Sequence, residues 1–384
     1  TNKFNLATQG RRQPGSTFKV FVLAAALEKG TSPNKTYDSS PANLPLPDGN
    51  VWKVRNYSDG PGRGMMTLRS ALISSVNCVF ARLIMDVGVT KVVQVAEKMG
   101  ITTELPPYPA IALGGLDTGV SPLEMASAYG TIDNGGMYTP TTPIVKITDA
   151  NGKVLMESKP KPAKAIEPTT AAMMTDIMKD VINYGTGVAA NIGRPAAGKT
   201  GTAEEYRDAW FAGFTPELST AVWVGYPQGQ VEMYSVHGIP VTGGSFPARI
   251  WGKFMSAALD GQPVSRFPTF SKQGDLTEVR VCAESGELPT KYCPRVITRL
   301  FPKNGEPTDT CSIHATPSDI PIPTVVGMSE QDAIDALKGA VFKPNVKRVA
   351  DPSVTAGQVV SQTPAGEAIA TQDTTVTITV SNGP

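Results

Sequence analysis

The segment "GRPAAGKTGTAEEYRDAWFAGF", residues 193–214, constrains the fold most, because it fits two incompatible local structures. Its glycines, together with Lys199 and Thr200, match G-x-x-x-x-G-K-[ST], a loop that holds phosphate between a buried strand and a helix. The same lysine and threonine, followed by Gly201, can instead lie on a β-strand. The first structure predicts a nucleotide site, and the second predicts a strand that binds substrate.

The flanking residues favour the strand. The preceding "VAANIGRP" contains Asn191, Arg194 and Pro195, which do not suit a buried hydrophobic strand. After Thr200 come a charged turn and another β-prone run, so the helix N-terminus that would hold phosphate is missing. A strand would present a cation and hydroxyls, and Gly201 would let a substrate backbone approach closely.

Helical hydrophobic patterns dominate the first half of the chain, and short β-prone runs begin near residue 196. This order predicts one α+β domain over residues 1–262, with a sheet between helices. Residues 263–318 look like a linker or small subdomain. Residues 319–384 predict a separate module, in which "TVTITVS" alternates as a half-buried strand does. The expected helices are 16–29, 67–87, 90–99, 121–134, 168–184, 245–259 and 329–340.

Charge and histidine content disfavour several functional classes. Lys and Arg number 35 against 34 Asp and Glu, so no excess of charge points to nucleic acid or anionic lipid. The chain has two histidines, His237 and His314, and neither G-x-S-x-G nor H-E-x-x-H. This composition disfavours a Ser-His-Asp hydrolase and a histidine-rich metal site. A serine nucleophile in this chain would therefore have a lysine as its base.

Ser16 and Lys19 form S-x-x-K at the start of a predicted helix. Positions i and i+3 share a helix face, so the lysine amine can reach the serine hydroxyl. Burial and nearby positive charge can lower the pKa of a lysine until it serves as a base for that hydroxyl. The alternative is a helix-capping serine beside an unrelated surface lysine. Residues 158–161 also match, in an exposed loop rich in proline and lysine.

Ser75 and Asn77 form S-x-N within the apolar stretch "RSALISSVNCVFARLI". Polar residues on such a face need hydrogen-bond partners, so the two are either part of a site or an ordinary buried polar pair. The adjacent Cys78 is expected to pack as a small apolar residue. Residues 32–34 fit S-x-N too, but they look like the turn after the first helix.

The order S-x-x-K, S-x-N and K-T-G resembles the penicillin-binding proteins. The similarity continues through "RRQPGSTFK", "LGGLDTGVSPLEMASAYGTIDNGG" and "GGSFPARIWGKFM", covers most of residues 4–260 and points to the bifunctional, class A members. Residues 319–384 resemble one PASTA module. The resemblance implies a multi-domain α/β chain. Its transpeptidase domain would be of the penicillin-binding-protein and serine β-lactamase type, with an antiparallel sheet between helices, and a small α+β PASTA domain would follow.

The resemblance places catalytic roles on five residues. Ser16 would attack the carbonyl between two terminal D-alanines, and Lys19 would take its proton. Ser75 would relay a proton to the leaving D-alanine with the help of Lys199. Asn77 would hold the amide of the donor peptide and help to position Lys19.

The resemblance also implies a binding strand. Thr200 and Thr202, with Gly201 between them, would bind the terminal carboxylate of a peptide or of a β-lactam. The backbone N–H groups of Ser16 and Thr202 would form the oxyanion hole, a contribution of roughly a few kcal/mol. The resemblance implies neither a cofactor nor a metal for this chemistry.

The implied function is a D,D-transpeptidase that crosslinks peptidoglycan stem peptides and that β-lactams acylate and inhibit. Muropeptides or proteins of cell division and elongation are the implied partners of the PASTA module. The alternatives are a β-lactamase or carboxypeptidase, a β-lactam sensor, and a PASTA module that is only a spacer. No E-x-x-L-N stretch occurs, so slow release of bound drug is expected.

We also expect this sequence to be a piece of a longer protein. No apolar run approaches the ~20 residues of a membrane span, and no signal peptide opens the chain. Related proteins carry a glycosyltransferase domain, a membrane anchor and additional sheet strands before S-x-x-K, yet only 15 residues precede Ser16. The implied location is the extracytoplasmic face of the bacterial membrane, with the anchor upstream.

Cys282, Cys293 and Cys311 lie with His314 in or near the expected linker. Outside the cytoplasm, a disulfide among the three cysteines is expected, with one thiol left over. The alternative is a zinc site with three cysteines and one histidine, because Cys311 and His314 have ligand-like spacing. The gap between Cys282 and Cys293 is wide for a zinc knuckle, which favours the disulfide.

Overall fold

A computed structural model describes residues 4–57, 60–267 and 276–384. The chain divides into two compact units, residues 1–277 with 300–305, and residues 278–299 with 306–384. The first unit holds the three motifs that resemble the penicillin-binding proteins, and the second holds His314 and the three cysteines near it.

A three-stranded antiparallel sheet lies at the centre of the first unit, in the order β11-β10-β9. Its strands are β9 (Ala197–Thr202), β10 (Asp208–Thr215) and β11 (Leu218–Gly225). Lys199 pairs with Ala212, and Gly201 pairs with Trp210. Because β9 runs as a strand through Thr202, Lys199 and Thr200 do not lie at the start of a helix, and the phosphate-loop alternative is excluded.

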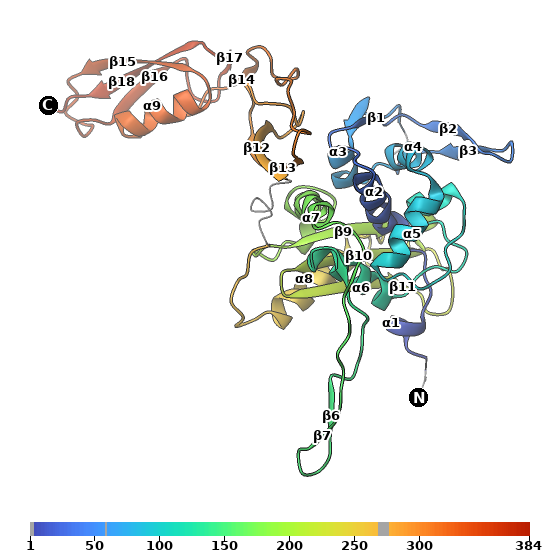
Figure 1. The fold of residues 1–384 in the computed structure, drawn as a ribbon. Coiled ribbons are helices and arrows are strands. Elements are labelled where there is room, and N and C mark those ends of the chain that lie inside the picture. Colours follow the sequence, from blue (N-terminus) through green and yellow to red (C-terminus); the bar gives the residue numbers. More distant parts are fainter. Residues whose placement is uncertain (1–3, 58–59, 268–275) are drawn as a thin grey trace. The chain divides into compact units, whose positions relative to one another are not determined.

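Helices cover both faces of this sheet (Figure 1). Trp210, Ala212 and Phe214 alternate along β10 and join the large core that helices on one face build. Phe211 points to the other face, where it packs against Trp251 of α8 (Phe246–Ala258). Every residue of β10 is therefore buried. The helices of the large core are α2 (Lys19–Glu28), α3 (Leu68–Ile73), α4 (Asn77–Val87), α5 (Val89–Met99), α6 (Pro122–Asp133) and α7 (Pro168–Asn183).

Helix α2 runs through the middle of the large core. All its residues from Lys19 to Leu27 are buried, which agrees with a sequence that is apolar on every side. The expected helix over residues 16–29 begins as the 3-10 turn η1 (Gly15–Phe18) and continues as α2. The expected helix over 121–134 is α6, where Ser121 and Glu124 form a capping box.

The expectation of one helix over residues 67–87 is wrong. The helix α3 ends at Ile73, and α4 begins at Asn77. Between them, Ser75 adopts a left-handed backbone conformation with φ 58°. A helical hydrophobic pattern continues across the break because the apolar side chains on both sides face the same core.

Short strand pairs and single turns complete the first unit. The hairpin of β6 and β7 extends away from the rest of this unit, and all its strand residues are exposed (Figure 1). The paired strands are β1 (Thr36–Asp38) with β4 (Met65–Thr67), β2 (Ala42–Pro45) with β3 (Val51–Val54), β5 (Met137–Tyr138) with β8 (Ala163–Lys164), and β6 (Lys146–Thr148) with β7 (Val154–Glu157). The remaining short helices are α1 (Leu6–Gln9), η2 (Pro109–Leu113), η3 (Val188–Ala190) and η4 (Glu204–Tyr206).

The C-terminal module packs one helix on a three-stranded sheet of order β15-β18-β16. Val376, Ile378 and Val380 of β18 are buried, which confirms the alternation expected for this strand. The elements are α9 (Glu330–Gly339), β15 (Lys343–Val349), β16 (Val359–Thr363) and β18 (Thr375–Ser381), with the pair β14 (Asp319–Pro321) and β17 (Ile369–Thr371). Before them, β12 (Leu276–Cys282) pairs with β13 (Val296–Pro302).

Among the described residues, no helix has the length and apolar character needed to cross a membrane.

Candidate active site

Ser16 lies in the 3-10 turn η1, directly before the buried helix α2. The Tyr129 hydroxyl donates to the carbonyl oxygen of Thr17 at 2.9 Å, and the Thr17 hydroxyl donates to the carbonyl of Pro14 at 2.7 Å. These bonds fix the turn from both sides. Within the residues that the structure describes, the Ser16 hydroxyl has no hydrogen-bond partner, so it is available to a substrate.

Lys19 is fully buried and makes three hydrogen bonds to the S-x-N segment. Its ammonium donates to the Ser75 carbonyl oxygen at 2.6 Å, to the Ser75 hydroxyl at 3.3 Å and to Asn77 Oδ1 at 2.7 Å. The other end of the Asn77 amide donates to the carbonyl of Arg55 at 3.0 Å. Because an amide has one acceptor oxygen, this second bond keeps Oδ1 turned towards Lys19.

Lys199 reaches the same hydroxyl from the strand β9. Its ammonium donates to Ser75 Oγ at 2.8 Å and to the Thr200 carbonyl oxygen at 2.9 Å. The Ser75 hydroxyl therefore lies between two buried lysines that come from distant parts of the sequence. The structure brings together Lys19, Ser75, Asn77 and Lys199, and it places Ser16 one turn before Lys19.

Burial lowers the pKa of both lysines. The pKa of Lys19 falls well below its ordinary value of 10.5, first because the amine is buried and second because the charge of Lys199 is near. Burial lowers the pKa of Lys199 to about 7. A lysine amine that is neutral near neutral pH can accept a proton from a serine hydroxyl, as a general base must.

The backbone at Ser75 explains how its hydroxyl comes to lie there. Helix α3 ends with a bond from the Ser75 N–H to the Leu72 carbonyl at 3.1 Å, and another from the Val76 N–H to the Ala71 carbonyl at 2.9 Å. This pair of bonds is a Schellman motif, whose left-handed position is usually glycine. Serine at that position costs about 1–2 kcal/mol. The fold thus holds a strained residue where the side chain meets two lysines.

The hydroxyls of the K-T-G strand belong to Thr200 and Thr202, and the Lys199 ammonium also lies 3.4 Å from Thr200 Oγ1. Thr200 Oγ1 shares a hydrogen bond of 2.6 Å with Thr186 Oγ1. Thr202 Oγ1 accepts from the Gly243 N–H at 3.1 Å, which leaves its own proton free to donate. Thr202 is half-buried and Thr200 is buried, so Thr202 is the more accessible of the two.

The register of the sheet determines where the Thr202 N–H points. The N–H of Ala203 donates to the Asp208 carbonyl at 2.8 Å, so these two residues form a hydrogen-bonded pair. Thr202 and Ala209 then form the neighbouring non-hydrogen-bonded pair, and the Thr202 N–H points away from β10. That side of β9 faces η1, because a Cβ on Gly15 would lie 2.6 Å from the Thr202 carbonyl oxygen. The Thr202 N–H therefore points towards the segment that carries Ser16.

Gly201 was expected to let a substrate backbone approach, but in the structure it lies against the segment that carries Ser16. A Cβ on Gly201 would lie 2.3 Å from the Pro14 carbonyl oxygen and 2.9 Å from Thr17 Cγ2. The glycine therefore lets the segment that carries Ser16 approach β9, so in this structure the close approach belongs to the protein's own backbone.

Two further motif matches lie outside the site. In residues 158–161, Lys159 and Lys161 are exposed in the loop after β7. Residues 33–34 form a turn after α2. The alternative interpretations of both matches, as ordinary loop and turn, agree with the structure.

Local patterns did not single out some residues that complete the site. Thr186 holds the Thr200 hydroxyl, Arg55 orients Asn77 through its carbonyl, and Tyr129 fixes η1. Backbone carbonyls carry no sequence signal at all. Thr186 lies within "GTG", residues 185–187, and a small polar residue between two glycines is a weak sign of close packing.

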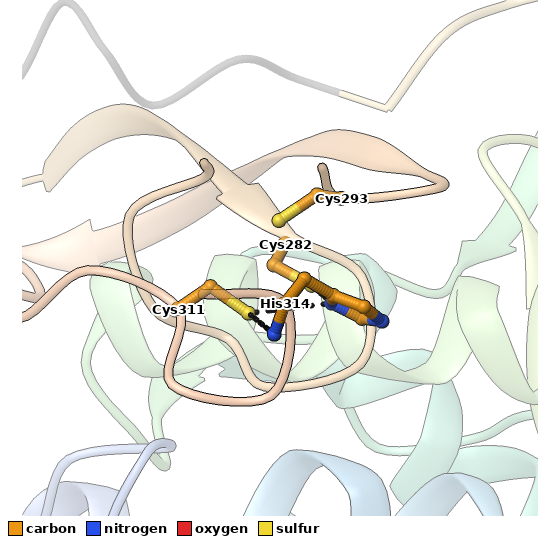
Figure 2. Close-up of side chains that lie close together, drawn as sticks. All are labelled: Cys282, Cys293, Cys311 and His314. Carbon is orange, nitrogen blue, oxygen red and sulfur yellow. Dashed lines mark hydrogen bonds between the residues drawn. The ribbon is translucent and has the colours of Figure 1, made fainter. Parts of the chain in front are cut away.

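The three cysteines Cys282, Cys293 and Cys311 lie together with His314 in the second unit (Figure 2). All three are free thiols in the structure, so the expected disulfide is not present there.

The first unit has the site of a serine enzyme, with two buried lysines at the hydroxyl of Ser75. Comparisons with known families then match three segments in succession. Residues 2–235 match the penicillin binding protein transpeptidase domain, residues 272–316 match the C-terminal domain of penicillin-binding protein 1A, and residues 320–382 match the PASTA domain. The chain therefore belongs to the penicillin-binding protein transpeptidase family.

Individual relatives agree with this family. Penicillin-binding protein 1A of Neisseria lactamica is 40% identical over 270 residues, which are 68% of this chain and 33% of that protein. The crystal structure of penicillin-binding protein 1A from Haemophilus influenzae has a TM-score of 0.69 at 28% identity, over 81% of this chain and 50% of that one. PonA1 of Mycobacterium tuberculosis, solved in complex with penicillin V, has a TM-score of 0.63 at 33% identity, over 70% of this chain and 74% of that one. The chain spans about a third of the length of the curated relatives that it matches.

Proposed function

We propose that the chain is the D,D-transpeptidase part of a peptidoglycan synthase. It joins two stem peptides through an ester on Ser16. The observation that supports this most is the convergence of Lys19 and Lys199 on the Ser75 hydroxyl, at 3.3 Å and 2.8 Å. Ser16 lies one turn before Lys19, and its hydroxyl has no hydrogen-bond partner among the described residues.

In the first half of the reaction, neutral Lys19 accepts the proton of Ser16 as its oxygen attacks the carbonyl of the penultimate D-alanine. The N–H groups of Ser16 and Thr202 receive the negative charge on the carbonyl oxygen. The peptide bond breaks, and the leaving amine of the terminal D-alanine takes a proton from the Ser75 hydroxyl. Ser75 regains a proton from Lys199 or Lys19, both within hydrogen-bond distance of it.

In the second half, the amine of a neighbouring stem peptide attacks the ester carbonyl. The attacking amine gives up a proton through Ser75 and the lysines, the Ser16–carbonyl bond breaks, and a proton from Lys19 returns to Ser16. The new amide is the crosslink. A β-lactam follows the first half only, because opening the ring leaves no separate amine to depart. The relative that was solved with penicillin V has the same fold at 33% identity, which supports β-lactam acylation here.

The substrate carboxylate would lie beside β9. The Thr202 hydroxyl is half-buried with a proton to donate, and Lys199 supplies positive charge from the same strand. A donor ending in D-Ala-D-Ala and a β-lactam both carry a carboxylate at the corresponding position, so one binding strand serves both.

This chemistry belongs on the extracytoplasmic side of a bacterial membrane, where peptidoglycan is assembled. The anchor and the glycosyltransferase domain of a bifunctional synthase would lie in parts of the protein outside this sequence. We propose the domain bounds 1–262, 263–318 and 319–384, and muropeptides or proteins of division and elongation as ligands of the PASTA module.

A donor-and-acceptor assay tests the proposed reaction. The chain is incubated with a thioester analogue of a stem peptide and a D-amino-acid acceptor, and the ligated product is measured by mass spectrometry. Ser16→Ala should abolish product, whereas Ser158→Ala, which alters the second match to S-x-x-K in the loop after β7, should leave it unchanged. Product formation by Ser16→Ala at the wild-type rate would refute the assignment of the nucleophile.

A further inference from the structure

We propose that Cys282, Cys293, Cys311 and His314 bind one Zn²⁺ ion in a closed, structural site. Their ligand atoms, one from each side chain, all lie within 4.8 Å of one another (Figure 2). The four side chains come from three places in the second unit: the end of β12, the segment before β13, and the loop after β13.

The distances match tetrahedral coordination. The Sγ atoms of Cys282 and Cys311 each lie 3.4 Å from His314 Nδ1. In a tetrahedral zinc site, bonds of about 2.3 Å to sulfur and about 2.0–2.1 Å to nitrogen separate those two ligand atoms by about 3.5 Å. The side chains thus already have the spacing that the metal requires.

Backbone donors point at two of the sulfurs. The Thr290 N–H donates to Cys293 Sγ at 3.3 Å, and the His314 N–H donates to Cys311 Sγ at 3.4 Å. Each bond closes a short turn that ends or begins at a ligand. Donors aimed at sulfur stabilise a thiolate, which is the form that binds metal.

The outer nitrogen of His314 is also held. Its Nε2 lies 3.4 Å from a carboxylate oxygen of Glu284, while Nδ1 faces the two sulfurs. A carboxylate on the far nitrogen orients a metal-binding imidazole and fixes which nitrogen binds. Glu284, two positions after Cys282, therefore orients the imidazole of His314.

The gap between Cys282 and Cys293 in the sequence disfavoured a zinc site. A tight turn after Cys282 closes this gap in space. The Gly286 N–H donates to the Cys282 carbonyl at 2.9 Å, and the Cys282 N–H donates to the Glu287 carbonyl at 2.9 Å. The chain reverses directly after Cys282, so Cys293 returns to the cluster. A disulfide would use only two of these four side chains, whereas a zinc ion uses all of them.

The donor set selects zinc over other metals and indicates a structural role. Three thiolates and one imidazole are soft or borderline ligands that suit Zn²⁺ and disfavour Mg²⁺ or Ca²⁺. Four protein ligands fill a tetrahedral zinc, which leaves no open position for a substrate. The site is therefore separate from the chemistry of Ser16.

A small apolar core explains why this segment needs a metal. Among the described residues from 278 to 316, the buried apolar side chains are Val281, Cys282, Phe301 and Cys311. Segments this small lack a sufficient core and are commonly stabilised by disulfides or metal. The match to the C-terminal domain of penicillin-binding protein 1A, residues 272–316, contains all four ligands.

The metal would also hold the segment to the C-terminal module. Between Thr290 and Cys293, Lys291 forms an ion pair with Asp373 at 2.9 Å, and the Tyr292 hydroxyl donates to the same carboxylate at 2.6 Å. Asp373 lies between β17 and β18 of the module. Loss of zinc should therefore release both the cysteine segment and this contact.

Zinc content of the full chain, produced without a histidine tag and purified in metal-free buffer, tests the proposal. We expect about one zinc per chain by elemental mass spectrometry. Cys311→Ser and His314→Ala should lose most of it, whereas Cys78→Ser, which alters the one cysteine in the first unit, should retain it. Ser16 labelling by a fluorescent penicillin, measured in parallel, is independent of zinc and reports on the proposed function separately.

Cobalt exchange provides a test that needs no variant. Wild-type chain loaded with Co²⁺ should show thiolate-to-metal charge-transfer absorption and the intense visible bands of tetrahedral cobalt. Wild-type chain that contains no zinc and has a disulfide among these cysteines by non-reducing peptide mapping would overturn the proposal. So would a weak octahedral cobalt spectrum, or a zinc content unchanged in Cys311→Ser.

Discussion

The ammonium of Lys199 donates to the hydroxyl of Ser75 at 2.8 Å, across a separation of 124 residues. The Ser75 hydroxyl also accepts a hydrogen bond from Lys19. Residues of S-x-x-K, S-x-N and K-T-G therefore meet at one oxygen atom. A proton can pass between either lysine and this hydroxyl without any movement of the backbone. The proposed mechanism depends on this relationship.

Replacing Lys199 with methionine should slow acylation by a β-lactam by about 10²–10⁴-fold, the usual contribution of a positioned proton-transfer group. Methionine keeps an unbranched side chain in the buried space but removes the amine. The second-order rate constant of acylation, measured with a chromogenic or fluorescent β-lactam, checks this. An unchanged rate constant would show that Lys199 has no part in proton transfer or substrate binding.

The same variant should shift the pH dependence of acylation. Lys19 must be neutral to act as a base, so the rate of acylation should fall as pH decreases through its pKa. The charge of Lys199 helps to lower that pKa, so Lys199→Met should raise it and move the acid limb to higher pH. Rate constants measured over a pH series in both proteins give the comparison. A limb that stays in place, or moves to lower pH, would contradict the role assigned to Lys199.

Ser75→Gly should produce a protein that is more stable than Ser75→Ala but equally slow in acylation. Glycine accepts the left-handed φ of 58° without the cost of about 1–2 kcal/mol that a Cβ incurs, whereas alanine keeps that cost. Both variants lack the hydroxyl between the lysines. Thermal unfolding and acylation rates of the two proteins, measured together, separate strain from chemistry. Equal melting temperatures would argue against strain at this residue.

Gly201→Ala should displace the segment that carries Ser16. The added Cβ would lie 2.3 Å from the Pro14 carbonyl oxygen, a backbone atom that can move only with η1. We expect destabilisation of about 1–3 kcal/mol and a large loss of acylation. Gly229→Ala is the matched control, because no atom lies within 4 Å of a Cβ there. Wild-type acylation by Gly201→Ala would mean that β9 and η1 are not packed as described.

The sequence allowed prediction of features that depend on local pattern. Period-two alternation predicted the strand "TVTITVS", and the absence of a helix after Thr200 predicted the strand β9. Apolar periodicity, with a proline near the start of each segment, predicted the helices α6 and α8. Each of these signals arises from residues that are neighbours in the chain.

Features that depend on distant contacts could not be predicted in this way. The break at Ser75 is hidden because apolar residues before and after it face one core. Gly201 looked like a site of substrate approach, but the close atom belongs to Pro14. The wide gap between Cys282 and Cys293 argued against a zinc site and so favoured a disulfide. In the structure, a tight turn after β12 brings Cys293 close to Cys282, and such a turn cannot be read from a residue count. In each case the deciding partner is far away in sequence or is a backbone atom.

The most direct test of the account is the identity of the residue that forms the covalent ester. The chain is incubated with penicillin V, its intact mass is measured over time, and the modified peptide is sequenced. We expect an increase equal to the whole drug, on Ser16 alone, that persists over hours. A drug adduct on any other residue, or no adduct on a folded chain, would contradict the central claim that Ser16 is the nucleophile.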